Sequence, residues 1–328
     1  MLDGYSRRTS ALSRARRHPA RNAWCLWLLL GYLAVCPLSV ASAAPASQPI
    51  YPTNMSLFYH NSNTGAAAVG WITPEFQHQT YRTYGPGTLP TSWSPAKAVS
   101  TPNGILLYDP YTGAARIITI NAFGDIATLS SYPAGTFWPF KEAAVWGNTV
   151  LLYDPRDPLD TVVLGEITPA GTFTTLSTYS WESRKWSTIV GTPNGFLFYN
   201  ASGGNAEVWQ VSNGMLWPVR SYPRDSFAAN WWHIVYANGY LIYYSPAFQS
   251  GAVGRLDANG IHTTLWYYPP ESFGMWREVV PTARGVLFYA PETGRGAVVE
   301  VQADGQLITR TVYPSGSFAP SWHVVCPL

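Results

Sequence analysis

The chain has 328 residues and a formal net charge of +2; only 12% of its residues are charged, whereas 15% are aromatic. This composition excludes a disordered polyelectrolyte, because such chains are rich in charge and poor in aromatic residues, and it excludes a coiled coil, in which Ala, Glu, Lys and Leu dominate. The small net charge also argues against a nucleic-acid partner, because binding phosphates requires a strongly basic face. With 28 Gly and 27 Pro, the chain is expected to be rich in turns and all-β.

Residues 1–43 have the organisation of a secretory signal peptide. Six arginines precede an apolar run over 23–35, and a small-x-small cleavage pattern follows at 41–43. The apolar run is shorter than the ~20 residues that a membrane span needs. We therefore expect a secreted protein that begins at Ala44 and has no membrane span. A lipobox-like pattern ending at Cys36 leaves a lipid anchor at that residue as the alternative.

Removal of this leader changes the charge and the cysteine count. The mature chain has a net charge of −3, and its one cysteine is Cys326. A single thiol cannot form an internal disulfide, so Cys326 is a candidate for linking two chains into an oligomer.

An apolar phrase that ends in Tyr occurs six times over residues 55–328. Its tyrosines are 44 to 49 residues apart: Tyr59, Tyr108, Tyr153, Tyr199, Tyr243 and Tyr289. A tryptophan follows each of them by 32 to 34 residues, except that Lys141 takes this place in the second copy: Trp93, Trp186, Trp231, Trp276 and Trp322. Two markers that stay in phase over six copies indicate a true repeat.

Each copy reads as four short strands, because Asn-Gly, Thr-Gly and related turn signals divide it into segments. Four strands in about 46 residues match one blade of a propeller. The sequence therefore predicts a single six-bladed β-propeller with four-stranded blades. Residues 44–54 form an extension before the first repeat and are a candidate for the strand that closes the ring.

The repeated aromatic residues have a structural explanation. A strand that is apolar at nearly every position is typical of burial on both faces, and a buried tyrosine needs a partner for its hydroxyl. We therefore expect one recurring tyrosine contact in each blade. We also favour packing between sheets over ligand binding for the repeated tryptophans.

Motifs for catalysis and cofactor binding are missing. The five histidines of the mature chain stand in no metal-binding motif, and no nucleophile elbow or phosphate-binding loop occurs. We therefore predict no cofactor and no enzyme activity. Asp154, Asp157 and Asp160 form one local acidic cluster that could bind Ca²⁺, but it lacks the Gly and the terminal Glu of a calcium loop, so a solvated loop is favoured.

The whole repeat, with Leu-Phe-Tyr, Thr-Gly, a later Gly and Tyr, Ser-Phe and Trp-x-x-Val-Val in order, resembles the PLL-like fucose-binding propeller lectins of bacteria. It resembles the tachylectins more loosely. This resemblance implies glycan sites in grooves between blades, lined by tryptophan and by the polar residues beside it. The candidate binding residues are Trp186, Trp231, Trp232, His233, Trp276, Arg277, Glu278, Trp322 and His323. The second copy has Lys141 and Glu142 there and is expected to have lost its site.

The favoured interpretation is a secreted, non-enzymatic, lectin-like propeller whose partners are glycans or glycoconjugates. One alternative is an extracellular scaffold that binds protein and would expose a large apolar patch. The other is a hydrolase or lyase whose histidines or carboxylates cluster at one mouth of the central channel. The position of the polar residues that are not repeated distinguishes the three: in the grooves, on an outer face or around the axis.

Overall fold

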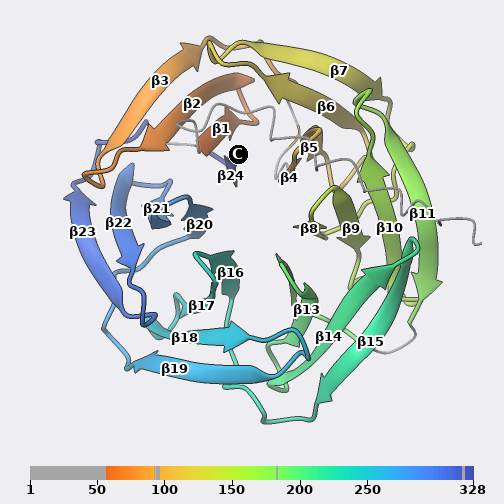
Figure 1. The fold of residues 1–328 in the computed structure, drawn as a ribbon. Coiled ribbons are helices and arrows are strands. Elements are labelled where there is room, and N and C mark those ends of the chain that lie inside the picture. Colours follow the sequence, from red (N-terminus) through yellow and green to blue (C-terminus); the bar gives the residue numbers. More distant parts are fainter. Residues whose placement is uncertain (1–56, 92, 94–96, 182–183, 320–321) are drawn as a thin grey trace, which may run out of the picture. The chain divides into compact units, whose positions relative to one another are not determined.

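The computed structural model describes residues 57–91, 93, 97–181, 184–319 and 322–328. Within these ranges there are 24 strands and no helix, and nothing long and apolar enough to span a membrane as a helix. The strands form six antiparallel sheets of four strands each, arranged as the blades of a β-propeller (Figure 1). The predicted fold is therefore confirmed. The predicted leader at 1–43, Cys36 and the extension at 44–54 lie outside the described residues.

We number the blades 1 to 6 and give the strands of each from the axis outward. Blade 1 contains β24 (Val324–Pro327), β1 (Leu57–Asn61), β2 (Ala66–Ile72) and β3 (His78–Tyr84). Blade 2 contains β4 (Lys97–Thr101), β5 (Gly104–Tyr108), β6 (Ala115–Ile120) and β7 (Ile126–Tyr132). Blade 3 contains β8 (Glu142–Trp146), β9 (Thr149–Tyr153), β10 (Thr161–Ile167) and β11 (Phe173–Ser180). Blade 4 contains β12 (Thr188–Thr192), β13 (Gly195–Asn200), β14 (Asn205–Ser212) and β15 (Met215–Tyr222). Blade 5 contains β16 (His233–Ala237), β17 (Tyr240–Ser245), β18 (Ser250–Leu256) and β19 (His262–Tyr268). Blade 6 contains β20 (Glu278–Thr282), β21 (Gly285–Ala290), β22 (Arg295–Val301) and β23 (Leu307–Tyr313).

The ring is closed within blade 1. Its innermost strand is β24, the last of the described strands, which pairs antiparallel with β1, the first of them, with Phe58 opposite Cys326. The innermost strands of all six blades contact one another in sequence around the axis, including β20 with β24 and β24 with β4. Each sequence repeat thus supplies the outer three strands of one blade and the inner strand of the next.

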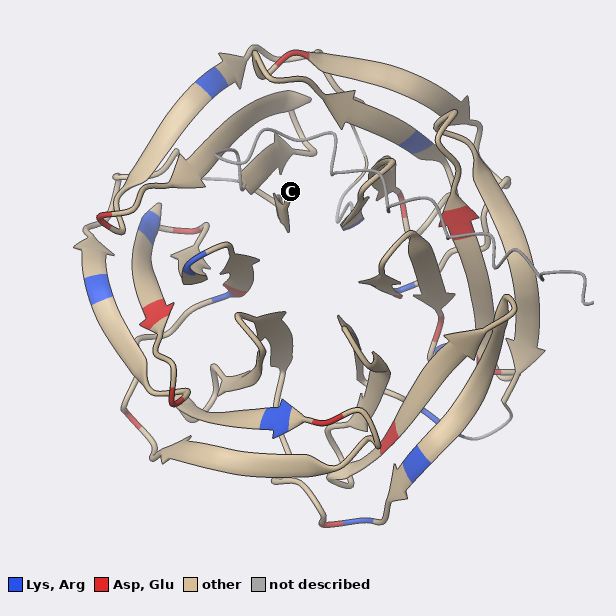
Figure 2. Cartoon of the chain, in the orientation of Figure 1, with Lys and Arg blue, Asp and Glu red and all other residues tan. Residues whose placement is uncertain are grey.

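The apolar phrases form the second strand of each blade, where both faces are covered. All five residues of β5 are buried, whereas the outermost strands are largely exposed. Six clusters of buried side chains fill the spaces between neighbouring blades, and that between blades 3 and 4 contains Trp186, Phe198 and Trp209. Packing between the sheets buries a large apolar surface. Few positions therefore remain for charged residues, and Figure 2 shows them (blue and red) at scattered places along the ribbon.

A tyrosine at the end of the second strand fixes the segment that enters the next blade. The Tyr199 hydroxyl donates to the carbonyl of Ala228 at 2.7 Å and accepts the N–H of Trp231 at 3.3 Å. The Tyr244 hydroxyl accepts the N–H of Trp276 at 2.9 Å in the same way. The expected tyrosine contact is therefore confirmed in blades 2 to 6, and it explains why the distance from tyrosine to tryptophan is nearly constant along the sequence.

Strand register corrects three positions in the predicted repeat. The equivalent residue is His60 rather than Tyr59 in blade 1, where its Nε2 lies 3.2 Å from the carbonyl of Pro90, and Tyr244 rather than Tyr243 in blade 5. In the second copy the buried Phe140, not Lys141, takes the place of the tryptophan. The sequence assigned the wrong residue because neighbouring residues, such as Tyr243 and Tyr244, fit a repeat pattern equally well. On a strand, however, neighbouring residues face opposite sides.

A second tyrosine, at the outer end of each blade, contacts the neighbouring blade. The hydroxyl of Tyr132 accepts the N–H of Phe173 at 2.8 Å, and that of Tyr268 accepts the N–H of Leu307 at 2.7 Å. The hydroxyl of Tyr313 accepts the N–H of His78 and so joins blade 6 to blade 1. Hydrogen bonds of this kind, from a backbone N–H of one blade to a tyrosine hydroxyl of its neighbour, connect the sheets at their periphery.

Candidate active site in the central channel

One residue from each blade stands at the same structural position beside the axis. It is the first residue of each inner strand and lies opposite the repeated tyrosine, or opposite His60 in blade 1. We call these six residues the inner tier: Lys97, Glu142, Thr188, His233, Glu278 and Val324. All six line a single cavity of about 830 Å³ that is bounded by the inner strands.

In five blades the residue that precedes the inner-tier member is described, and it lines the same cavity. We call these residues the mouth tier: Lys141, Ser187, Trp232, Arg277 and His323. Their backbone N–H groups all donate to the carbonyl of the repeated residue, as Ser187 does to Tyr199 at 2.8 Å and His323 does to His60 at 3.1 Å. The framework thus fixes the backbone of both tiers and leaves the side chains free to differ between blades.

The inner tier contains both acidic and basic side chains, and the pKa values of three of them are shifted. Burial raises the pKa of Glu278 to about 7, although the ammonium of Lys97 opposes this shift. Burial also raises the pKa of Glu142, again against Lys97. Burial lowers the pKa of His233 to about 4, and the charge of Lys97 lowers it further, so this ring is neutral at neutral pH. One ammonium therefore acts on three titratable groups from three other blades, and Glu278 can exchange a proton near pH 7.

The mouth tier is held by contacts to nearby loops. Arg277 Nη1 donates to Glu292 Oε1 at 2.7 Å, and the Glu292 side chain comes from the loop after β21. The N–H of Ser62 donates to Nδ1 of His323 at 3.2 Å. The indole of Trp232 is 66% exposed. An anionic group at this mouth would meet the Arg277 guanidinium, whereas an apolar ring would meet Trp232.

The predicted site residues separate into two groups. Trp186, Trp231 and Trp276 are 2%, 5% and 6% exposed and belong to the cores between blades, and the half-buried Trp322 packs against Tyr59. By contrast, the polar neighbours all line the central channel: Trp232, His233, Arg277, Glu278 and His323. The structure therefore does not place the repeated tryptophans and their polar neighbours together in grooves between blades. It places the polar residues around the axis.

Lys97 and Glu142 are functional candidates that the sequence reading missed. The second copy was expected to have lost its site, whereas its Glu142 belongs to the inner tier and lines the same cavity as the other members. Lys97 comes four residues after Trp93, whereas His233 and Glu278 come two residues after their tryptophans. Only counting along the strands from the repeated tyrosine would have revealed it.

The acidic cluster at 154–160 does not come together as a metal site. The Asp154 carboxylate accepts from Arg156, Asp157 accepts from Thr161, and Asp160 accepts from Lys185. Over the described ranges, no group of three or more His, Cys, Asp or Glu residues could hold a metal ion. Cys326, considered as an interchain link, is 1% exposed, and burial raises its pKa to about 12.

No protein-family model matches the chain, and no match is found among the curated proteins. Solved structures do match. A protein from Lactobacillus plantarum superposes with a TM-score of 0.54 at 15% identity, over 80% of this chain and 82% of that one. A putative 6-phosphogluconolactonase from Bacteroides fragilis gives 0.52 at 13% identity, over 88% and 89%. The periplasmic gluconolactonase of Pseudomonas aeruginosa gives 0.50 at 14% identity, over 79% and 83%. These identities establish the propeller fold alone.

These findings correct the functional prediction. The non-enzymatic, lectin-like interpretation is wrong: three of its tryptophans, Trp186, Trp231 and Trp276, are core residues, its polar residues surround the axis, and fold neighbours carry the names of lactonases. No family model or curated protein supports the resemblance to PLL-like lectins or tachylectins. Two carboxylates and a histidine line one cavity at the axis, which is where the hypothesis of a central-channel hydrolase or lyase places its polar residues.

Proposed function

We propose that this protein is a hydrolase whose active site is the central channel and whose substrates are cyclic esters, that is, lactones. The observation that carries the proposal is the inner tier, in which four blades place Lys97, Glu142, His233 and Glu278 at one structural position around one cavity. Perturbed carboxylates beside a cation in a cavity are typical of catalytic sites. The choice of lactones follows the names of two fold neighbours.

The two glutamates supply an acid and a base. Lactone hydrolysis adds water to the carbonyl carbon and breaks the bond from that carbon to the ring oxygen. Glu278, with a pKa of about 7, is partly ionised at neutral pH and accepts the proton of the attacking water. Glu142, whose pKa is also raised by burial, gives a proton to the ring oxygen as the bond breaks.

Cationic groups stabilise the charges that develop. The Lys97 ammonium faces the same cavity as both glutamates and stabilises the negative oxygen that forms when water adds to the carbonyl. His233 is neutral and offers one hydrogen-bond donor and one acceptor for orienting the substrate. Arg277 at the mouth attracts the carboxylate of the hydroxy-acid product.

The test is a pH-stat assay of acid release from a panel of lactones, with glucono-δ-lactone first. Glu278→Gln and Glu142→Gln should each lower kcat/KM by about 10²–10⁴-fold, the usual contribution of a general acid or base. Glu75→Gln, at an exposed glutamate in the turn after β2, is the control and should retain full activity. No hydrolysis above the uncatalysed rate for any lactone of the panel, or an unimpaired Glu278→Gln variant, would refute the proposal.

We further propose that the protein acts outside the cytoplasm. The arginine-rich start, the apolar run and the cleavage pattern of residues 1–43 support this. Mass spectrometry of the protein purified from its producing cells should find a mature N-terminus at Ala44. A protein that retains residues 1–43 in the cytoplasmic fraction would contradict this proposal.

A further inference from the structure

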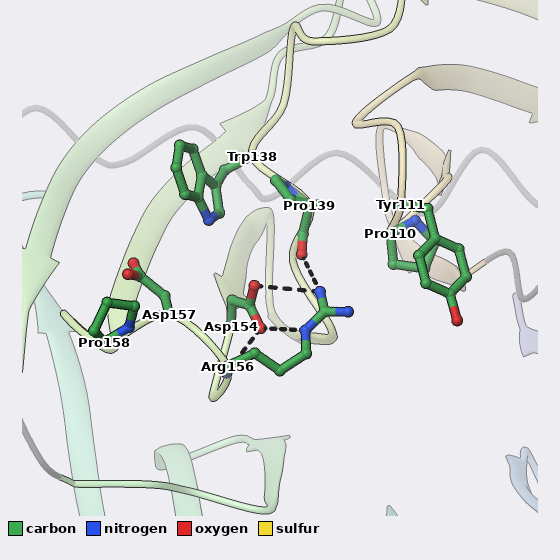
Figure 3. A pocket seen from close by; sticks show the side chains of 8 residues that line it. All are labelled: Pro110, Tyr111, Trp138, Pro139, Asp154, Arg156, Asp157 and Pro158. Carbon is green, nitrogen blue, oxygen red and sulfur yellow. Dashed lines mark hydrogen bonds and ion pairs between the residues drawn. The ribbon is translucent and has the colours of Figure 1, made fainter.

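A second cavity opens beside the central channel, between blades 2 and 3. We call it the side groove. It has a volume of about 330 Å³ and comprises the loop after β5, the segment before β8 and the loop after β9: Pro110, Tyr111, Trp138, Pro139, Asp154, Arg156, Asp157 and Pro158 (Figure 3). Pro110, Tyr111 and Arg156 also line the channel cavity, so the two spaces are adjacent and share a wall. A molecule bound at the inner tier could therefore extend into the side groove.

Arg156 in this shared wall is held in a fixed position. Its Nε donates to Asp154 Oδ1 at 2.8 Å, and its Nη2 donates to Asp154 Oδ2 at 3.2 Å and to the carbonyl of Pro139 at 2.6 Å. Asp154 is itself buried. The remaining nitrogen, Nη1, points to the side of the groove where Pro110 and Tyr111 lie (Figure 3). A donor that is already oriented loses little side-chain entropy when it binds a ligand oxygen.

The charge of the groove fits a neutral ligand. Asp154 offsets the charge of Arg156, and Asp157 is a further acid whose pKa is lowered by its hydrogen bond from Thr161. The groove therefore has no excess of positive charge that would select a phosphate or another strong anion. It offers instead a hydrogen-bond donor at Arg156 and acceptors at Asp157, which suit hydroxyl groups.

Two exposed aromatic rings complete the groove. Trp138 is 56% exposed and Tyr111 is 64% exposed, and they stand on opposite sides of Arg156 (Figure 3). Neither ring occupies a position of the repeated tyrosines or tryptophans, so packing between blades does not explain why an aromatic residue is present there. The apolar face of a sugar ring stacks on such planes while its hydroxyls reach the polar groups. A space of about 330 Å³ equals that of about eleven waters, which accommodates one such ring.

We propose that the side groove is a second substrate subsite, which binds a sugar ring attached to the lactone in the channel. The substrate class is then a lactone derived from a disaccharide or a longer saccharide rather than from a single sugar. This inference rests on the proposed lactonase function for the reacting end of the substrate. Trp138 and Tyr111 are binding residues in it, not catalytic ones.

The experiment measures binding of the two reaction products, so that it does not depend on catalysis. Titration calorimetry compares gluconate with maltobionate, which is gluconate carrying one further glucose ring. The wild-type protein should bind maltobionate about tenfold more tightly, a difference of ~1.4 kcal/mol. In Trp138→Ala this preference should fall to about one. Trp217→Ala, which removes an exposed tryptophan from β15, is the matched control and should retain the preference.

The outcomes separate this inference from the proposed function. Equal affinities for the two acids, no binding of either, or an unchanged preference in Trp138→Ala would overturn the side groove as a sugar subsite. A clear preference for maltobionate that Trp138→Ala abolishes would support it even if no lactone were hydrolysed, and that result would count against the lactonase proposal alone.

Discussion

Replacing Glu278 by Gln should make the protein more stable at alkaline pH while it lowers the proposed activity. Burial raises the pKa of this carboxyl from 4.5 to about 7, so the folded protein favours the protonated form. Between pH 4.5 and 7 the folded state binds more protons than the unfolded state, and the wild-type protein therefore loses stability as the pH rises through this window. At 1.36 kcal/mol for each pH unit, the loss above pH 7 is about 3 kcal/mol.

The variant resembles the protonated carboxyl at every pH and avoids this loss. Urea unfolding should show wild type and Glu278→Gln to be about equal at pH 4.5 and should show the variant to be about 3 kcal/mol more stable at pH 8. With an unfolding slope near 3 kcal/mol per molar urea, this difference is a midpoint shift of about 1 M. Glu75→Gln should shift neither midpoint. Equal stability of wild type and Glu278→Gln at pH 8 would refute the reasoning, because Glu278 would then be ionised in the folded protein at no cost.

The proposed lactonase activity of the wild type should rise with pH through an apparent pKa near 7. Lys97→Met should move this rise to higher pH, because the ammonium lowers the pKa of Glu278. An unchanged pH profile in this variant would show that Lys97 does not influence the catalytic base. Tyr244→Phe should lower the free energy of unfolding by about 1–3 kcal/mol, since it leaves a buried N–H and a carbonyl without their partner. Tyr267→Phe, at an exposed ring, should change it by less than about 0.5 kcal/mol, and equal effects would contradict the role of the repeated tyrosine. Cys326 should react with a thiol reagent only in denaturant, because it is buried and its pKa is raised to about 12; rapid labelling of the native protein would disprove this.

The fold could be predicted because the repeat encodes it redundantly. The apolar phrases, the turn signals and the spacing of Tyr199 from Trp231 each indicate one blade, and the hydrogen bond from the N–H of Trp231 to the Tyr199 hydroxyl makes the spacing a physical constraint. The function could not be predicted in the same way. A repeat pattern averages over copies, whereas the site consists of the positions at which the copies differ, such as Lys97 in one blade and Glu278 in another.

To locate the candidate site, the direction in which the side chains point must also be known. His233 and Glu278 were named from the sequence as polar residues close to the repeated tryptophans, but the sequence does not show in which direction their side chains point. In a propeller that direction can lead to a groove between blades or to the axis. The strand pairing decides for the axis, because these residues begin the innermost strand of their blades. Trp138 was missed for another reason: it stands at a position that is not conserved between the copies of the repeat, and it belongs to no motif.

Closure of the ring through β24 has a consequence for how the protein folds. Blades 2 to 6 are each continuous in sequence and can form as their strands become available, but blade 1 needs β1 and β24, which lie more than 260 residues apart. Until β24 arrives, β1 presents an unpaired edge that another chain could join, and the slow formation of such distant contacts prolongs this exposure. A nascent chain is thus most prone to aggregation just before β24 is added. Slowing synthesis of residues 324–327 should lower the yield of folded protein more than slowing it at any of the earlier strands.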